Sequence, residues 1–90
     1  MQKLGDMMAH VRLMSRMGKT VGVDLVRAHD AGLMSQEDWA DLVQSCRGCD
    51  WARCPDWLDR HGSVETAPKT CPNHARFAEL KTQLQELDDV

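Results

Sequence analysis

Four cysteines lie in a short stretch of the chain and are the residues best suited to carry chemistry. Their spacing is Cys46-x2-Cys49-x4-Cys54-x16-Cys71, and Cys54 and Cys71 are each followed directly by proline. Proline suits the first position of a helix, so each Cys-Pro pair predicts a thiol at a helix N-cap. The unpaired N–H groups and the positive dipole end there favour a thiolate. Four thiolates form a complete ligand set for a metal ion or an iron–sulfur cluster.

The two kinds of metal centre differ in the cysteine spacing that they usually use. Structural zinc sites commonly pair two C-x2-C units, whereas this chain has only one, Cys46 and Cys49. Three cysteines close together and a distant fourth before a proline are more typical of an iron–sulfur protein. A [4Fe–4S] cluster is therefore our first choice, and zinc is the alternative. A thioredoxin-like redox pair would need a strand-and-helix setting that the sequence lacks.

Other residues near the cysteines have both a functional and a purely structural interpretation. His61 and His74 could replace a cysteine or tune the centre, but a helix C-terminus and a solvated first turn also account for them. Trp51 and Trp57 could screen the site from water or simply pack. The nearby cations could offset the charge of four thiolates or be merely solvated, and they are Arg47, Arg53 and Lys69.

The elements that precede the cysteines are predicted to be helices. Apolar residues recur at helical spacing from Leu4 to Met17, and Gly18 stands where that helix would end. A second helix is expected from about Thr20 to Asp30. The spacing therefore predicts an amphipathic, methionine-rich helix over residues 1–18 and a shorter helix after it.

The cysteines themselves are expected on three further helices. Ser35 and Asp38 are close to a capping box, and apolar residues follow at positions 39, 42, 43 and 46, which places Cys46 on the buried face of a third helix. Cys54 is expected to begin a short fourth helix and Cys71 to open the last one. No alternating strand pattern is sustained. The predicted fold is all-α, a small bundle of about five helices, two of them short, with a four-cysteine core over residues 33–88.

Length and composition limit what this chain can be. Ninety residues with a single phenylalanine predict one domain, residues 1–90, with a thin core. Small domains commonly need a disulfide, a metal or a partner subunit as a staple. The N-terminus has no basic stretch followed by an apolar run, and no segment approaches the roughly 20 apolar residues that span a bilayer. We therefore expect a cytoplasmic protein, in which reduced thiols favour metal binding over disulfides.

Charge and motifs exclude several classes of function. The net charge is −3, with a basic first third and an acidic remainder, which does not resemble the footprint of a nucleic-acid binder. No Ser-His-Asp set, phosphate-binding loop, HExxH motif or paired-carboxylate site is present, so we do not expect an enzyme.

The cysteine set resembles a family of short bacterial proteins of unknown function. The resemblance is carried by Cys46-Arg-Gly-Cys49, by Cys54 with Trp57-Leu58, and by Cys71-Pro72-Asn73 with Phe77 and Leu80, and it covers about residues 33–80. It implies that the four cysteines are a shared feature of that family. It implies no activity or ligand, and it leaves residues 1–18 as a variable attachment.

The methionine-rich helix has two interpretations. Its methionines can be a core stripe that fills irregular gaps, or they can form an adaptable docking surface. A basic edge beside them would suit an acidic protein partner, or less favourably an anionic membrane surface. The candidate partner-binding residues are Met7, Met8, Met14, Met17, Arg12 and Arg16.

These observations lead to two hypotheses of function. The first is a small cytosolic iron–sulfur protein, with Cys46, Cys49, Cys54 and Cys71 as ligands, that passes electrons or reports redox or iron status to a protein partner. The second is a zinc-stapled helical adaptor for protein–protein interaction.

Overall fold

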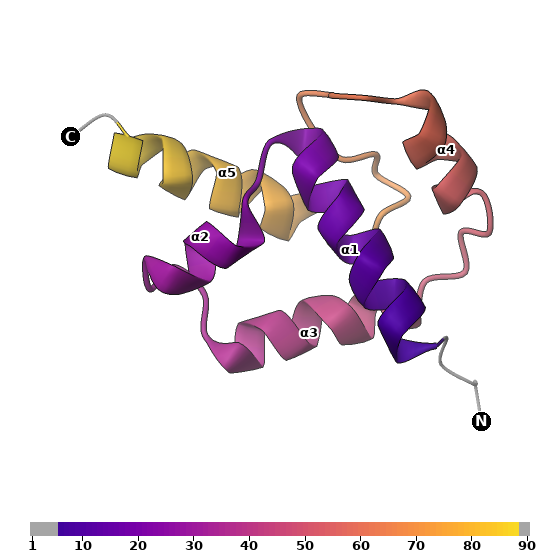
Figure 1. Ribbon diagram of the computed structural model, residues 1–90, viewed down its shortest axis with the longest axis horizontal. Coiled ribbons are helices and arrows are strands. Elements are labelled where there is room, and N and C mark those ends of the chain that lie inside the picture. Colours follow the sequence, from indigo (N-terminus) through magenta and orange to yellow (C-terminus); the bar gives the residue numbers. More distant parts are fainter. Residues whose placement is uncertain (1–5, 89–90) are drawn as a thin grey trace.

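The computed structural model describes residues 6–88 and shows five helices (Figure 1). They are α1 Met7–Val21, α2 Leu25–Asp30, α3 Gln36–Arg47, α4 Cys54–Arg60 and α5 His74–Asp88. The described residues contain no strand, so the predicted all-α class with two short helices is confirmed. Leu4, at the start of the predicted first helix, lies outside the described residues. No helix in this part of the chain is long and apolar enough to cross a membrane.

Helix α1 does not end at Gly18 as predicted, but continues to Val21. It ends at Gly22, whose φ of 84° is left-handed and whose N–H reaches the carbonyls of Gly18 and Lys19. Gly18 has a different role, because a Cβ built there would lie only 3.1 Å from the Val23 carbonyl oxygen. The absence of a side chain at Gly18 therefore lets the chain fold back closely against α1.

Helix α2 is shorter than predicted because α1 takes its first residues. It begins only at Leu25, after the side chain of Asp24 accepts a hydrogen bond from the Arg27 N–H at 3.0 Å. Helix α3 begins where predicted, since Ser35 and Asp38 form a complete capping box. These caps satisfy N–H groups that a helix start leaves unpaired.

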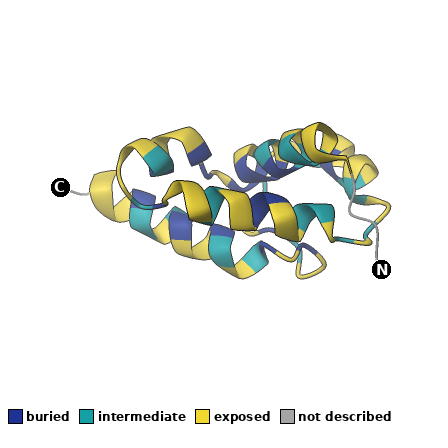
Figure 2. Ribbon diagram, turned by 90° about the horizontal axis from the view of Figure 1, so that it is seen from below, coloured by how far each residue is buried: buried dark blue, intermediate teal, exposed yellow. Residues whose placement is uncertain are grey.

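The helices form a thin molecule with one small core. Its extents are 45 × 29 × 19 Å, and the shortest is about the thickness of two packed helices. Helix α1 packs against α3 and α4. Figure 2 shows the buried positions along the helix faces that turn inward. The least exposed large side chains are Phe77, Met14, Leu80, Val21 and Val23.

The long connection from α4 to α5 is held against the rest of the chain. The Val64 N–H donates to the carbonyl of Thr20 at 2.8 Å, and the Lys81 Nζ donates to the carbonyl of Glu65 at 2.7 Å. Ala67 is buried, and its carbonyl lies 2.5 Å from Nδ1 of His74. These bonds fix the path by which the chain returns to Cys71.

Candidate metal centre

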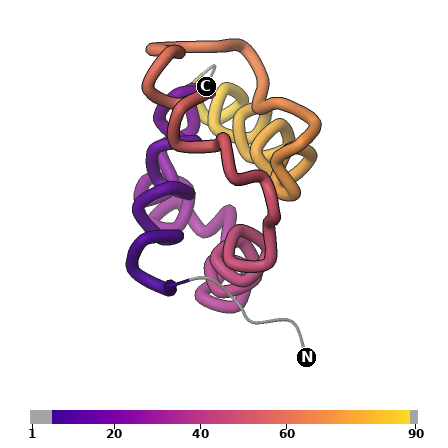
Figure 3. Tube along the Cα trace, turned by 90° about the vertical axis from the view of Figure 1, so that its right-hand side faces the viewer, coloured from indigo at the N-terminus to yellow at the C-terminus, as the bar shows by residue number. Residues whose placement is uncertain are grey.

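All four cysteines line one small cavity in the interior. Cys46 is near the end of α3, Cys49 lies in the following turn, Cys54 is the first residue of α4, and Cys71 lies in a turn before α5. Figure 3 shows the connection from α3 to α4 on the side of the molecule that faces the viewer. The cavity has a volume of about 20 Å³. Its remaining walls are Leu13, Met14, Met17, Trp51, Pro72, Asn73 and Phe77.

Sharing this cavity does not by itself make the cysteines a formed metal site. Among residues 6–88, no three cysteine, histidine, aspartate or glutamate side chains stand in an arrangement that could hold a metal ion. All four thiols are free. The volume of about 20 Å³ has room for about one water molecule. The donor set and the apolar walls fit a thiolate-bound metal, but the thiols would have to turn before all four could bind one centre.

The predicted N-cap positions of Cys54 and Cys71 are wrong. Arg53 is the N-cap of α4, so Cys54 is already its first helical residue and Pro55 its second. Cys71 lies three residues before α5, in a turn where its N–H donates to the Pro68 carbonyl at 2.9 Å. A separate turn follows Cys71 because its carbonyl accepts the N–H of His74 at 3.0 Å. The helix start therefore comes too late to place the Cys71 thiol at its N-cap.

Cys54 and Cys71 are also less acidic than the helix-dipole argument predicted, because their pKa values are raised. Burial and, to a smaller extent, the neighbouring sulfurs of Cys54, Cys71 and Cys49 together raise the pKa of Cys46 to about 11. Burial likewise raises the pKa values of Cys54 and Cys71. Desolvation outweighs the helix ends here because the cavity walls are mostly apolar. In the metal-free protein these three residues are therefore thiols at neutral pH.

Two backbone N–H groups nevertheless point to sulfur. The Trp51 N–H donates to Sγ of Cys49 at 3.5 Å. The backbone of Asn73 hydrogen-bonds to Cys71. This bond lowers the pKa of Cys71 and so opposes the larger effect of burial, which raises it. In the opposite sense, Sγ of Cys46 donates to the His10 carbonyl at 3.5 Å. Such N–H donors stabilise a sulfur that carries negative charge, so they suit a bound metal.

Of the other candidate residues near the cysteines, some line the cavity and some do not. Trp51 lines the cavity, whereas Trp57 does not, and neither do His61 and His74. One ring nitrogen of each histidine contacts a backbone carbonyl: Nδ1 of His61 lies 2.7 Å from the Trp57 carbonyl, and Nδ1 of His74 contacts the carbonyl of Ala67. The cations Arg47, Arg53 and Lys69 do not line the cavity.

The candidate partner-binding residues of α1 differ in their exposure to solvent. Met14 and Met17 are each only 2% exposed and form part of the cavity wall, so they belong to the core interpretation. Met7 and Met8 are more than half exposed. The guanidinium of Arg16 is bound to Asp59 of α4 at 2.7 Å. Arg12 is exposed.

Sequence reasoning missed the residues of other helices that complete the cavity. Leu13, Met14 and Met17 close it from α1, and Phe77 closes it from α5. Asn73 is 5% exposed, and its Nδ2 donates to the Leu42 carbonyl of α3 at 2.9 Å. A polar asparagine immediately after Cys-Pro was the available signal for that role.

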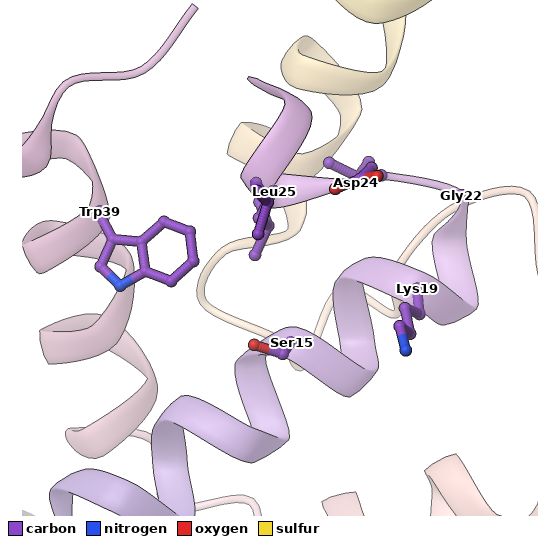
Figure 4. A pocket seen from close by; sticks show the side chains of 8 residues that line it. Ser15, Lys19, Gly22, Asp24, Leu25 and Trp39 are labelled. Carbon is purple, nitrogen blue, oxygen red and sulfur yellow. The ribbon is translucent and has the colours of Figure 1, made fainter. Parts of the chain in front are cut away.

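A larger hollow lies between α1, α2 and α3, away from the cysteines (Figure 4). It has a volume of about 350 Å³, and Trp39 and Leu25 face it. Its carboxylate, Asp24, already caps α2, and the other polar side chains of its lining are Ser15 and Lys19. None of the four cysteines lines this hollow.

The amino-acid sequence matches one protein family. A family described as a family of unknown function (DUF6455) matches residues 1–83, so the chain belongs to that family. The resemblance expected from the cysteine set is confirmed, but its extent was too small. The match includes residues 1–18, so the first helix is part of the family and not a variable attachment. No curated protein and no solved structure matches the chain.

Proposed function

We propose that this member of a family of unknown function is a small iron–sulfur protein, in which Cys46, Cys49, Cys54 and Cys71 are the cluster ligands. One observation carries the proposal: four cysteines from three separate parts of the chain line the same cavity. A bound cluster would supply one-electron chemistry. The protein would pass electrons, or report redox or iron status, to a protein partner in the cytoplasm. We propose no substrate turnover.

The surrounding residues supply what such a centre needs from the protein. The backbone N–H groups of Trp51 and Asn73 are directed at sulfur and would stabilise the added negative charge. Met14, Met17 and Phe77 are each at most 2% exposed and keep water away from the cavity. A protein sets the reduction potential of a cluster in part by excluding water from it and by donating N–H hydrogen bonds to its sulfur atoms.

The centre would also supply stability that the core lacks. Its ligands come from the end of α3, the start of α4 and the turn before α5, while α1 forms a wall. Bound metal would therefore tie four helices together in a chain with one phenylalanine. Metal affinity then contributes directly to folding free energy, because the unfolded chain offers no preformed site.

A single zinc ion is the second candidate, and the size of the cavity favours it. About 20 Å³ is close to the space of one water molecule, which suits one ion better than a four-iron cluster. To hold a cluster, the cavity would have to widen at Cys49, which lies in the non-helical segment after α3, and at Cys54, which directly follows that segment. With zinc, the protein would be a stapled helical adaptor that binds another protein.

Purification without oxygen, followed by a visible spectrum and metal analysis, separates the two candidates. A brown protein with iron and sulfide supports the cluster, whereas a colourless protein with about one zinc per chain supports the adaptor. Serine substitutions at Cys46, Cys49, Cys54 and Cys71 should each lower metal content. The matched controls His61→Ala and His74→Ala should leave metal content unchanged. A folded chain that binds neither metal would overturn both candidates.

A further inference from the structure

A surface hollow lies directly beside the cysteine cavity, around α4. Its volume is about 530 Å³. Trp51 lines both this hollow and the cysteine cavity, so the two share one residue. The lining residues are Trp51, Arg53, Asp56, Trp57, Arg60 and His61.

The hollow carries positive charge that the other residues between positions 6 and 88 leave unpaired. Arg53 and Arg60 are exposed, and neither forms an ion pair with another residue in the range 6–88. Asp59, on the same helix, is already neutralised by Arg16 of α1. Asp56 is then the single carboxylate facing two guanidinium groups in the lining. In a chain of net charge −3, this local excess of positive charge is suited to an anionic partner.

The aromatic residues form a preassembled wall and not an open slot. The ring centroids of Trp51 and Trp57 are 6.0 Å apart with an angle of 57° between the planes. His61 stacks on Trp57 at 4.2 Å, and its Nδ1 is fixed by the Trp57 carbonyl. Since His61 covers one face of Trp57, the hollow is poorly arranged to sandwich a flat ligand. Tryptophan and arginine side by side are instead the residue types that dominate protein–protein contacts.

We propose that this hollow is the docking site for an acidic segment of a protein partner, with a partner carboxylate bound between Arg53 and Arg60. Charge complementarity selects the occupant. The identity of this partner rests on the proposed function: we take it to be the protein that exchanges electrons or a signal with the cysteine centre. A partner bound in the hollow would contact Trp51, which also lines the cysteine cavity. The site replaces the methionine face of α1, where Met14 and Met17 are buried and Arg16 is already paired.

The test uses an end-blocked hexaglutamate peptide as the probe and the whole protein, with binding followed by calorimetry and tryptophan emission. Arg53→Glu and Arg60→Glu should each weaken binding roughly five- to thirtyfold, because reversal removes one attraction and adds one repulsion between exposed charges. Arg12→Glu is the matched control, an exposed arginine that does not line the hollow, and it should change binding by less than about twofold. Native binding should weaken as salt is added.

Three results would overturn the docking proposal: no binding of the peptide, equal binding by the native protein and both reversal variants, or displacement by pyrophosphate at the same concentration as the peptide. The last result would mean that the hollow takes small anions. Metal content of the same preparations is measured separately. If the variants keep their metal but bind the peptide unchanged, docking fails and the metal centre stands. If the native protein purified without oxygen is folded and carries neither iron nor zinc, but shows the charge-dependent binding, docking stands and the proposed function fails.

Discussion

Substitution of Asn73 tests how the cysteine cavity is held together. Its side chain is 5% exposed, and Nδ2 donates to the Leu42 carbonyl of α3 at 2.9 Å. Its own carbonyl accepts the Phe77 N–H at 2.9 Å in the first turn of α5, while its backbone hydrogen-bonds to Cys71. One residue therefore connects α3 to α5 at the wall of the cavity. Only the bond to Leu42 depends on the side chain, so a substitution isolates it.

The expected loss of stability follows from what each substitution leaves unpaired. Asn73→Ala removes one buried hydrogen bond and a few buried atoms, but Leu42 lies inside α3, where the helix itself offers its carbonyl a partner. We expect a loss of about 1–2 kcal/mol. Asn73→Asp keeps the shape but turns a carboxylate toward that carbonyl in a buried position. It should cost about 3 kcal/mol or more at neutral pH.

The aspartate variant carries a pH signature that the alanine variant lacks. Burial and the facing carbonyl should raise its folded pKa above the unfolded value, so the folded state holds its proton more tightly. Stability is then greatest below the unfolded pKa and is lost as pH rises through the folded pKa. The deficit of Asn73→Asp should therefore shrink on acidification, while that of Asn73→Ala should change little relative to the native protein.

Urea unfolding of the metal-free, reduced protein, followed by circular dichroism, measures these losses. Gln85→Ala is the control, because Gln85 is exposed on the same helix and should change stability by less than about 0.5 kcal/mol. A domain of this size has only about 5–13 kcal/mol of total stability, so the aspartate loss should be plain. If Asp and Ala at position 73 are equally stable at neutral pH, or both match the control, the bond to Leu42 does not hold α3 and α5 together.

Three further predictions concern the rest of the fold. Gly22→Ala should cost about 1 kcal/mol in urea unfolding, because the φ of 84° is strained for alanine, whereas Gly62→Ala, with no such φ and nothing within 4 Å of a Cβ, should be close to neutral. Leu80→Ala, at a fully buried position, should lose about 2–5 kcal/mol in the same assay, and a smaller loss would mean that α5 is loosely packed. Since burial raises the pKa of Cys46 to about 11, the metal-free protein should lose up to about 2 kcal/mol as pH rises from about 9 to 11. Thermal unfolding under reducing conditions should show that slope flattened in Cys46→Ser.

Local signals in the sequence were sufficient for α3 but not for the end of α1. Ser35 and Asp38 satisfy each other's backbone N–H groups, so that helix start depends on neighbours in sequence alone. Gly18 and Gly22 are both possible helix ends by composition. The choice between them depends on the approach of Val23 to Gly18, a contact made only after the chain folds back. Sequence-local reasoning has no access to that distance.

For the candidate site, the spacing predicted that the four cysteines lie around one place, but it did not predict their environment there. The separation of Cys54 from Cys71 allowed the chain to return to one place, and the shared cavity agrees with that. The proline after Cys54 and after Cys71 predicts a helix N-cap and an acidic thiol, and this prediction of acidity is wrong. Their pKa values depend instead on burial by residues from elsewhere in the chain, and burial raises them.

The first helix shows why the proposed metal binding would depend on the core of this protein. Met14 and Met17 of α1 are among the least exposed residues, and they also close the cysteine cavity. The side chains that exclude water from the thiols are thus the same ones that form the core. A thiolate-bound metal would remove the charge penalty that now keeps Cys46, Cys54 and Cys71 protonated, and would release their protons. Loss of the methionine wall should therefore weaken metal affinity and folding by the same physical cause, the entry of water between α1 and the cysteines.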